Sequence, residues 1–151
     1  MNIIACVRQT PDTETVIKIA GAGNGIETDG VKFVLGAYDE YALEAAAQIK
    51  EKNGGEVTVV TVGGDRAAEA LRQCLAVGAD KAVHLNDKSG TDDALSIATA
   101  LAEQIKKMPH DLVFVSNKGT DSDRGAVSPM LAELLGLPYV GLCTEIEVED
   151  G

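Results

Sequence analysis

The chain has 151 residues, a length that fits one domain with one hydrophobic core. Its apolar content of 45% is normal for a globular protein, but aromatic residues make up only 3%, so we expect a core of alanine, valine, leucine and isoleucine. The net charge of −11 argues against binding to nucleic acid or to an anionic membrane surface.

The chain begins with an apolar run, Ile3 to Val7, that predicts a buried first strand. About six apolar residues without a basic segment are too few for a signal peptide or for direct membrane insertion. Three cysteines, Cys6, Cys74 and Cys143, lie far apart in the sequence and lack the spacing of a redox or metal pair. We therefore expect reduced thiols and a cytoplasmic protein.

A hairpin is expected next, before the first helix. Residues 15–19 and 31–34 are rich in β-branched residues and flank a glycine-rich turn. The glycines of residues 21–25 are explained by turn formation rather than by phosphate binding, because they do not lie between a strand and a helix.

The rest of the chain alternates between helices and strands. Helices are predicted over 37–52, 65–77, 91–107 and 124–135, and strands over 57–62, 81–85, 112–115 and 138–140. We expect Asp65 to cap the second helix, Thr91-Asp92-Asp93 to open the third, and Asn53-Gly54-Gly55 to stop the first, as a left-handed cap would. The pattern predicts an α/β fold: a doubly wound, mainly parallel, Rossmann-like sheet with an inserted hairpin.

Residues 1–143 are predicted to form one nucleotide-binding domain. Residues 144–151 alternate between polar and apolar side chains and predict the first arm of a further hairpin, which stops at the turn signal Asp150-Gly151. We therefore expect a fragment, or a chain whose continuation is missing.

Three polar loops follow predicted strands, at 6–8, 62–64 and 116–120. Such strand ends meet at one edge of an open α/β sheet, where ligands bind. Gly63 and Gly64 would let a flat ring or a phosphate approach the backbone, and the predicted helix near Arg124 would offer N–H groups to a phosphate. Arg124 is either an added cationic donor to a ligand or a surface residue. The polar groups of these loops favour a nucleotide as the ligand.

No catalytic site is visible in the sequence. No serine or cysteine has a histidine nearby, and His84 and His110 are isolated, so neither a catalytic triad nor a zinc site is predicted. The Walker motif and the G-x-G-x-x-G fingerprint are absent. The acidic pairs Asp92-Asp93 and Asp121 with Asp123 lie where helix caps are expected.

Four segments together resemble the electron transfer flavoprotein β subunit. Residues 3–12 resemble its first strand, which is followed by Val-Lys-x-Val-Pro-Asp. Residues 36–46 are similar to its signature Asn-Pro-Tyr-Asp-x-x-Ala-Leu-Glu-x-Ala, residues 62–82 to its Leu-Arg-x-Ala-Leu-Ala-Met-Gly-Ala-Asp segment, and residues 111–121 to its Asp-Leu-Ile-Leu-x-Gly-x-Gln-Ala-x-Asp segment. The resemblance covers essentially the whole chain, in order and with similar spacing.

The resemblance implies an adenine nucleotide α-hydrolase-like fold and an electron carrier subunit rather than a catalyst on its own. It implies a heterodimer with an electron transfer flavoprotein α subunit, acyl-CoA or other dehydrogenases as electron donors, and AMP or a second FAD in the strand-end crevice. The cofactor-binding residues are then Cys6, Gly36, Ala37, Tyr38, Asp39, Val62, Ser116, Asn117, Lys118, Gly119, Thr120, Asp121, Ser122, Asp123, Arg124, Gly125, Ala126 and Val127, with Gly63 added from the strand-end loops.

The chain departs from the family pattern at several of these positions. Gly36 stands where the family often has asparagine, and Ser116 stands where it often has glycine. Lys118-Gly119 replace a common Gln-Ala pair, and Ala126 replaces a common glutamine. Two other nucleotide-binding classes are alternatives. A stand-alone regulatory module of the universal-stress-protein type would carry a glycine-rich phosphate loop that is not found here. A hydrolase or ligase of the pyrophosphatase type would need a Ser-Gly-Gly loop where residues 8–11 stand.

Overall fold

The protein is described by a computed structural model that covers residues 1–23, 25–90 and 92–149. Its main sheet has four parallel strands, β1 (Asn2–Cys6), β4 (Glu56–Gly63), β5 (Lys81–Asn86) and β6 (Leu112–Val115), in the order β5-β4-β1-β6. The predicted parallel α/β fold is therefore confirmed, and these strands match the predicted ones to within about one residue.

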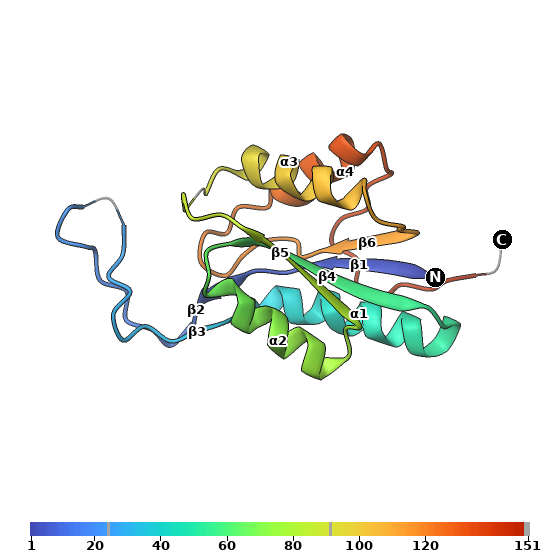
Figure 1. Ribbon diagram of the computed structural model, residues 1–151, viewed down its shortest axis with the longest axis horizontal. Helices are drawn as coiled ribbons and strands as arrows, with labels where there is room; N and C mark the ends of the chain where they lie inside the picture. The colour runs from blue at the N-terminus through green and yellow to red at the C-terminus, as the bar shows by residue number, and fades with distance from the viewer. Residues whose placement is uncertain (24, 91, 150–151) are drawn as a thin grey trace.

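Helices cover both faces of this sheet (Figure 1). Helices α1 (Ala37–Asn53) and α2 (Ala67–Val77) lie on one face, and α3 (Ala94–Ile105) and α4 (Val127–Leu135) on the other. Side chains alternate along each strand, so Ile3 and Val59 pack toward α1 and α2, whereas Ile4 and Val60 pack toward α3 and α4. The strands are apolar on both faces because each face is covered.

The ends of the helices follow the prediction in part. Helix α3 begins at Ala94, three residues later than predicted, and Asp93 of the predicted opening caps it, with its carboxylate accepting a hydrogen bond from the Ser96 N–H at 2.8 Å. Thr91 lies outside the described residues. Helix α1 stops at Asn53-Gly54-Gly55 as predicted, and Gly54 has a positive φ of 73°, but its ψ of 171° is extended, so the stop differs from a regular left-handed cap. Asp65 does not cap α2, because the N-cap residue is Arg66. The Asp65 carboxylate instead accepts a hydrogen bond from Asn86 Nδ2 at 2.6 Å.

Helix α4 begins three residues later than predicted. The chain turns through Asp123, which has a positive φ of 55°, so the backbone is not helical there. Arg124 therefore lies before the helix, and its guanidinium pairs with the carboxylate of Asp92. Gly136 ends α4 in the left-handed conformation, at the predicted residue.

The inserted hairpin is present, but its paired arms differ from those predicted. The two-stranded ladder joins β2 (Gln9–Pro11) to β3 (Phe33–Leu35), nearer the sheet than residues 15–19. Further out, only an isolated bridge joins Ile19 to Ile26 among the described residues, and Asn24 of the turn lies outside them. The hairpin projects from the body of the protein (Figure 1), so residues 15–19 have no neighbouring sheet edge in the described part of the chain with which to pair. Their β-branched residues therefore do not form the predicted strand.

The segment after α4 does not form the predicted strand over 138–140. The Tyr139 and Val140 side chains are 47% and 77% exposed, and the Tyr139 hydroxyl lies 3.3 Å from Ser128 Oγ of α4 rather than along the edge of β6. Residues 144–149 form no strand, and Asp150-Gly151 lies outside the described residues, so the hairpin extension stays a prediction.

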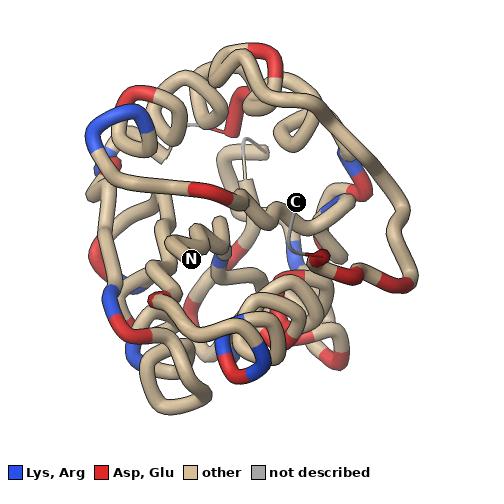
Figure 2. Tube along the Cα trace, turned by 90° about the vertical axis from the view of Figure 1, so that its right-hand side faces the viewer, with Lys and Arg blue, Asp and Glu red and all other residues tan. Residues whose placement is uncertain are grey.

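The last residues return to the α1 side of the sheet, where Val148 packs against the core cluster that contains Ile3 and Leu43. The N-terminus and residues 144–149 lie at the end of the molecule opposite the hairpin (Figure 1). Acidic and basic residues are interspersed when the protein is seen from that end, and residues 144–149 carry only acidic charges (Figure 2). No helix within 1–23, 25–90 and 92–149 is long and apolar enough to cross a membrane.

The turn between α1 and β4 provides a test of the fold. Gly55 has a φ of 120°, and an added Cβ would collide with the Met1 carbonyl at the start of β1. We expect Gly55→Ala to lower the free energy of unfolding by roughly 2–4 kcal/mol, measured by urea denaturation. Gly136→Ala, at a φ of 69° in open space, should cost only about 1 kcal/mol. Equal losses for the two variants would contradict the close approach of β1 to this turn.

Candidate functional site

A cleft of about 320 Å³ lies at the carboxyl ends of β1, β4 and β6. This is the edge of a parallel sheet at which ligands usually bind. Ten sequence-predicted residues line the cleft: Cys6, Asp39, Val62, Gly63, Ser116, Asn117, Lys118, Gly119, Arg124 and Val127. The fold therefore brings together residues that are up to about 120 positions apart in the sequence, as expected for a crevice built from successive strand ends.

The other predicted residues lie next to the cleft without lining it: Gly36, Ala37, Tyr38, Thr120, Asp121, Ser122, Asp123, Gly125 and Ala126. Some of them support residues that do line it. The Asp121 carboxylate pairs with the Arg8 guanidinium, and Asp123 pairs with Lys118 Nζ at 2.5 Å. Their assignment to a cofactor site stays a prediction.

The structure adds lining residues that the predicted set omitted: Val7, Arg8, Gln9, Gly64, Asp65, Arg66, Ala67, Asp92, Ile97, Leu101, Val115 and Ser128. Arg8 and Gly64 could have been found, because both belong to the strand-end loops recognised in the sequence. Ile97 and Leu101 could not, because an apolar residue on a helix carries no sign that it faces a cleft instead of the core.

Asp39 is the one carboxylate of the cleft that is buried, with only 2% of its surface exposed. It lies in the first turn of α1, where the N-terminus of a helix favours negative charge, and its Oδ2 accepts the main-chain N–H of Arg8 at 3.0 Å. Burial raises the pKa of Asp39 to about 6, although the Ser116 hydroxyl, the Arg8 N–H and the Arg8 charge favour the ionised form. Gly36 precedes this turn, and a side chain there would collide with the Asp39 carboxylate.

Gly119 allows the Arg8 guanidinium to lie across the loop that follows β6. A Cβ at position 119 would lie 2.5 Å from Arg8 Nη1 and 2.5 Å from Asp121 Oδ1. The glycine therefore leaves room for the ion pair between Arg8 and Asp121, which joins the end of β1 to the loop. The loop holds Ser116 and Asn117 at the edge of the cleft.

The cleft is more cationic than the protein as a whole. Its charged lining comprises four cations, Arg8, Arg66, Lys118 and Arg124, and three carboxylates, Asp39, Asp65 and Asp92, in a chain with a net charge of −11. Arg66 has no carboxylate partner among the described residues, and its guanidinium carbon instead lies 3.3 Å from the centre of the Phe33 ring. An exposed, unpaired guanidinium remains available to an anionic ligand.

Two helices point uncapped N-termini at the cleft. Helix α2 follows the Gly63-Gly64 turn, and α4 begins at Val127; neither has a side-chain cap, and residues from the first turn of each line the cleft. Pro129, which has no N–H, occupies the third position of α4, where the lost donor costs no helical hydrogen bond. In α2 the N–H groups of Ala67, Ala68 and Glu69 already donate to the carbonyls of Gly64, Asp65 and Arg66, so this helix offers an anion such as phosphate mainly its dipole. In α4 the N–H groups of Val127 and Ser128 have no backbone acceptor among the described residues and can bind an anion directly.

The thiol in the cleft is not a reactive group. Cys6 is buried, and burial together with the Asp39 charge raises the pKa of its thiol to about 12. A protonated thiol is a poor nucleophile and a poor metal ligand. Within the described residues, no group of three or more histidine, cysteine, aspartate or glutamate side chains could hold a metal ion.

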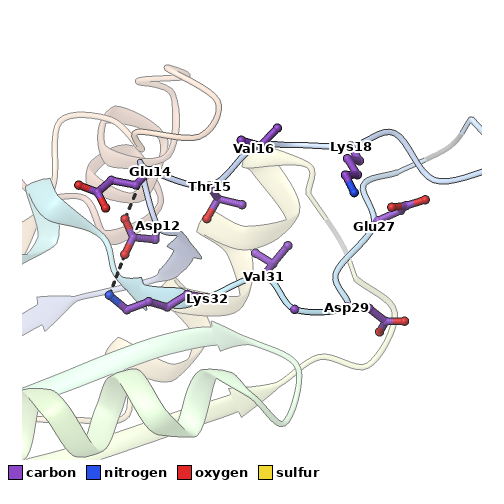
Figure 3. Close-up of a pocket in the computed structure, with 10 residues that line it drawn as sticks. Asp12, Glu14, Thr15, Val16, Lys18, Glu27, Asp29, Val31 and Lys32 are labelled. Carbon is purple, nitrogen blue, oxygen red and sulfur yellow. Dashed lines mark hydrogen bonds and ion pairs between the residues drawn. The ribbon is translucent and has the colours of Figure 1, made fainter.

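A second cavity, of about 410 Å³, lies between the arms of the hairpin (Figure 3). Its lining includes four carboxylates, Asp12, Glu14, Glu27 and Asp29, and only two lysines, of which Lys32 pairs with Asp12 at 2.8 Å. It contains no helix N-terminus and has an acidic excess, so it is unsuited to a phosphate. The strand-end cleft is therefore the better candidate site.

The fold and the cleft define the class of the protein: a parallel α/β protein with an anion-receptive crevice at the carboxyl ends of its strands. Residues 23–151 match the family model of the electron transfer flavoprotein domain. The chain therefore belongs to the electron transfer flavoprotein family, as the resemblance of its motifs predicted.

Its relatives in this family include β subunits. The electron transfer flavoprotein subunit beta of Bacillus subtilis (strain 168) is 41% identical to this chain, over 98% of the chain and 58% of the relative. That of Clostridium acetobutylicum is 38% identical, over 99% of the chain and 58% of the relative. Subunit CarD of the caffeyl-CoA reductase-Etf complex of Acetobacterium woodii is 40% identical, over 99% of this chain and 58% of the relative. The chain thus spans somewhat less than two-thirds of the length of these relatives.

The buried carboxyl group of the cleft leads to a prediction about pH. The folded protein holds the Asp39 proton more tightly than the unfolded chain, so this group stabilises the fold below about pH 4, and that contribution is lost as the pH rises through about 6. The rise of the Asp39 pKa from its usual value of 3.8 to about 6 corresponds to about 3 kcal/mol. Urea denaturation should therefore show Asp39→Asn gaining about 3 kcal/mol relative to the wild type between about pH 4 and pH 7.

Asp80→Asn is the control for this prediction. Hydrogen bonds from the Val57 N–H and from Lys50 lower the pKa of Asp80, so its contribution is present above its usual pKa and is lost as the pH falls. This variant should not gain stability relative to the wild type as the pH rises. Parallel pH profiles for the wild type and Asp39→Asn would contradict the description of Asp39 as a carboxylate destabilised by burial.

Proposed function

We propose that this chain is the nucleotide-binding part of an electron transfer flavoprotein β subunit, and that the strand-end cleft binds AMP or the adenine nucleotide portion of FAD. The observation that carries the proposal is the convergence of two helix N-termini without side-chain caps and the unpaired Arg66 guanidinium on one cleft of an acidic protein. A phosphate is stabilised by both features.

The lining residues fit the parts of an adenine nucleotide. The phosphate would accept hydrogen bonds from main-chain N–H groups in the first turn of α4 and from Arg66 or Arg124 at the edge of the cleft. The glycines at 63 and 64 would let the ligand approach the main chain, and Ile97, Leu101 and Val115 offer an apolar wall to a ring. Bound FAD would supply a redox-active group, whereas AMP would supply none.

The proposal extends to the partners of the subunit. The names of its relatives describe β subunits and, for CarD, a part of a reductase-Etf complex. We infer that the protein works with an α subunit as an electron carrier for dehydrogenases such as acyl-CoA dehydrogenases and is no catalyst on its own. The sequence supports this, because no nucleophile with a nearby base is found in it.

Nucleotide binding is tested by calorimetric titration of the protein with AMP, ADP and FAD. At least one of the three should bind, and Arg66→Gln should weaken that binding about fivefold, which corresponds to about 1 kcal/mol, because an unpaired cation is removed from the cleft. Arg72→Gln makes the same charge change on the exposed face of α2, away from the lining residues, and should bind like the wild type. No heat with any of the three nucleotides would refute the proposal.

Partnership is tested by co-expression of the chain with an electron transfer flavoprotein α subunit from the same organism. We expect a yellow complex in which both subunits elute together in gel filtration and the flavin absorbance follows the protein. The chain expressed without the α subunit should retain less flavin. A colourless mixture in which the two chains elute separately would count against the assigned partner.

A further inference from the structure

The carbonyl oxygen of Gly63, at the end of β4, accepts two hydrogen bonds from β5 and the residues just after it. One comes from His84 Nε2 at 2.9 Å, and the other from the Asp87 N–H at 3.0 Å. A carbonyl oxygen can only accept, so His84 Nε2 must carry a proton. Both the neutral Nε2–H tautomer and the imidazolium meet this requirement.

The turn that these bonds hold is part of the cleft, whereas the groups that hold it are not. Gly63, Gly64, Asp65 and Arg66 line the cleft, but His84, Asn86 and Asp87 do not. Asn86 adds a third contact, from its Nδ2 to Asp65 Oδ1 at 2.6 Å. The end of β5 thus supports the Gly63-Gly64 turn from the side away from the ligand space.

The orientation of one peptide unit links this support to the cleft. The peptide between Gly63 and Gly64 is trans, so its C=O and N–H groups point in opposite directions. A carbonyl held toward β5 therefore turns the Gly64 N–H away from β5. Glycine at both positions would otherwise leave this peptide free to rotate, because glycine adopts more backbone conformations than other residues.

We propose that His84 is a positioning residue for the nucleotide cleft: by holding the Gly63 carbonyl, it fixes the turn whose backbone and following helix N-terminus meet the ligand. The inference rests on the proposed nucleotide binding, which it deepens by naming a residue that acts on the ligand through another group. His84 is half-buried on β5 and does not touch the ligand space itself.

The test compares two variants of this residue with a matched control. His84→Leu removes the donor, whereas His84→Gln keeps a side-chain N–H. His110 makes a bond of the same kind, from Nδ1 to the Met108 carbonyl at 2.9 Å, but it lies before β6, near the opposite edge of the sheet. His110→Leu therefore removes an equivalent bond that does not support the cleft.

The measurements are calorimetric affinity for the nucleotide that the wild type binds, and amide hydrogen exchange without ligand at residues 67–69, whose N–H groups donate to the carbonyls of Gly64, Asp65 and Arg66. We expect His84→Leu to bind about tenfold more weakly and to exchange faster at these amides, and His84→Gln to bind within about threefold of the wild type. His110→Leu should match the wild type in both measurements. Urea denaturation confirms that each variant is folded under the conditions of the titration.

Two results would overturn the inference: wild-type affinity and exchange in His84→Leu, or the same loss in His84→Gln as in His84→Leu. Failure of the proposed function would look different. In that case the wild type would bind no nucleotide, and the exchange at residues 67–69, which needs no ligand, would still report whether His84 holds the turn.

Discussion

The cleft depends on one buried carboxylate. Asp39 accepts the main-chain N–H of Arg8 at the end of β1, lies beside the Ser116 hydroxyl at the end of β6, and belongs to the first turn of α1. Three elements distant in the sequence therefore meet at one polar group. Burial of a carboxylate is unfavourable unless it is hydrogen-bonded, and the raised pKa of Asp39 indicates that part of this cost remains. This unfavourable burial occurs at the carboxyl ends of the strands, where Asp39 holds the edge of the cleft in place for a ligand.

Charge is distributed around the cleft so that an acidic protein can receive an anion. Arg8, Lys118 and Arg124 each pair with a carboxylate, which orders their side chains, while Arg66 lies over Phe33 at the base of the hairpin. The helices that begin at the cleft lack side-chain caps, whereas α3 is capped by Asp93. Missing caps cost about 1 kcal/mol each in isolation, and a bound phosphate would supply the acceptor that a capping side chain otherwise provides.

Much of this architecture follows from local patterns. The strands at 57–62 and 112–115 and the helix at 37–52 were predictable because apolar periodicity and glycine stops agree there. The start of α4 was not, because the positive φ of Asp123 depends on contacts made after folding. The paired arms of the hairpin and the segment 138–140 were also missed, since β-branched residues become strands only where a partner edge is in reach. The strand-end loops predicted the place of the cleft, but Arg66 and the apolar wall from α3 required the folded chain.

The most direct measurement of the central claim is the location of the bound nucleotide by backbone NMR. Titration of the isotope-labelled protein with AMP should shift the amide signals of residues 63–67 and 126–128, at the two helix N-termini, and leave those of the hairpin cavity at residues 14–18 unchanged. Shifts confined to the hairpin, or absent from both helix N-termini at saturation, would contradict the assignment of the strand-end cleft as the ligand site.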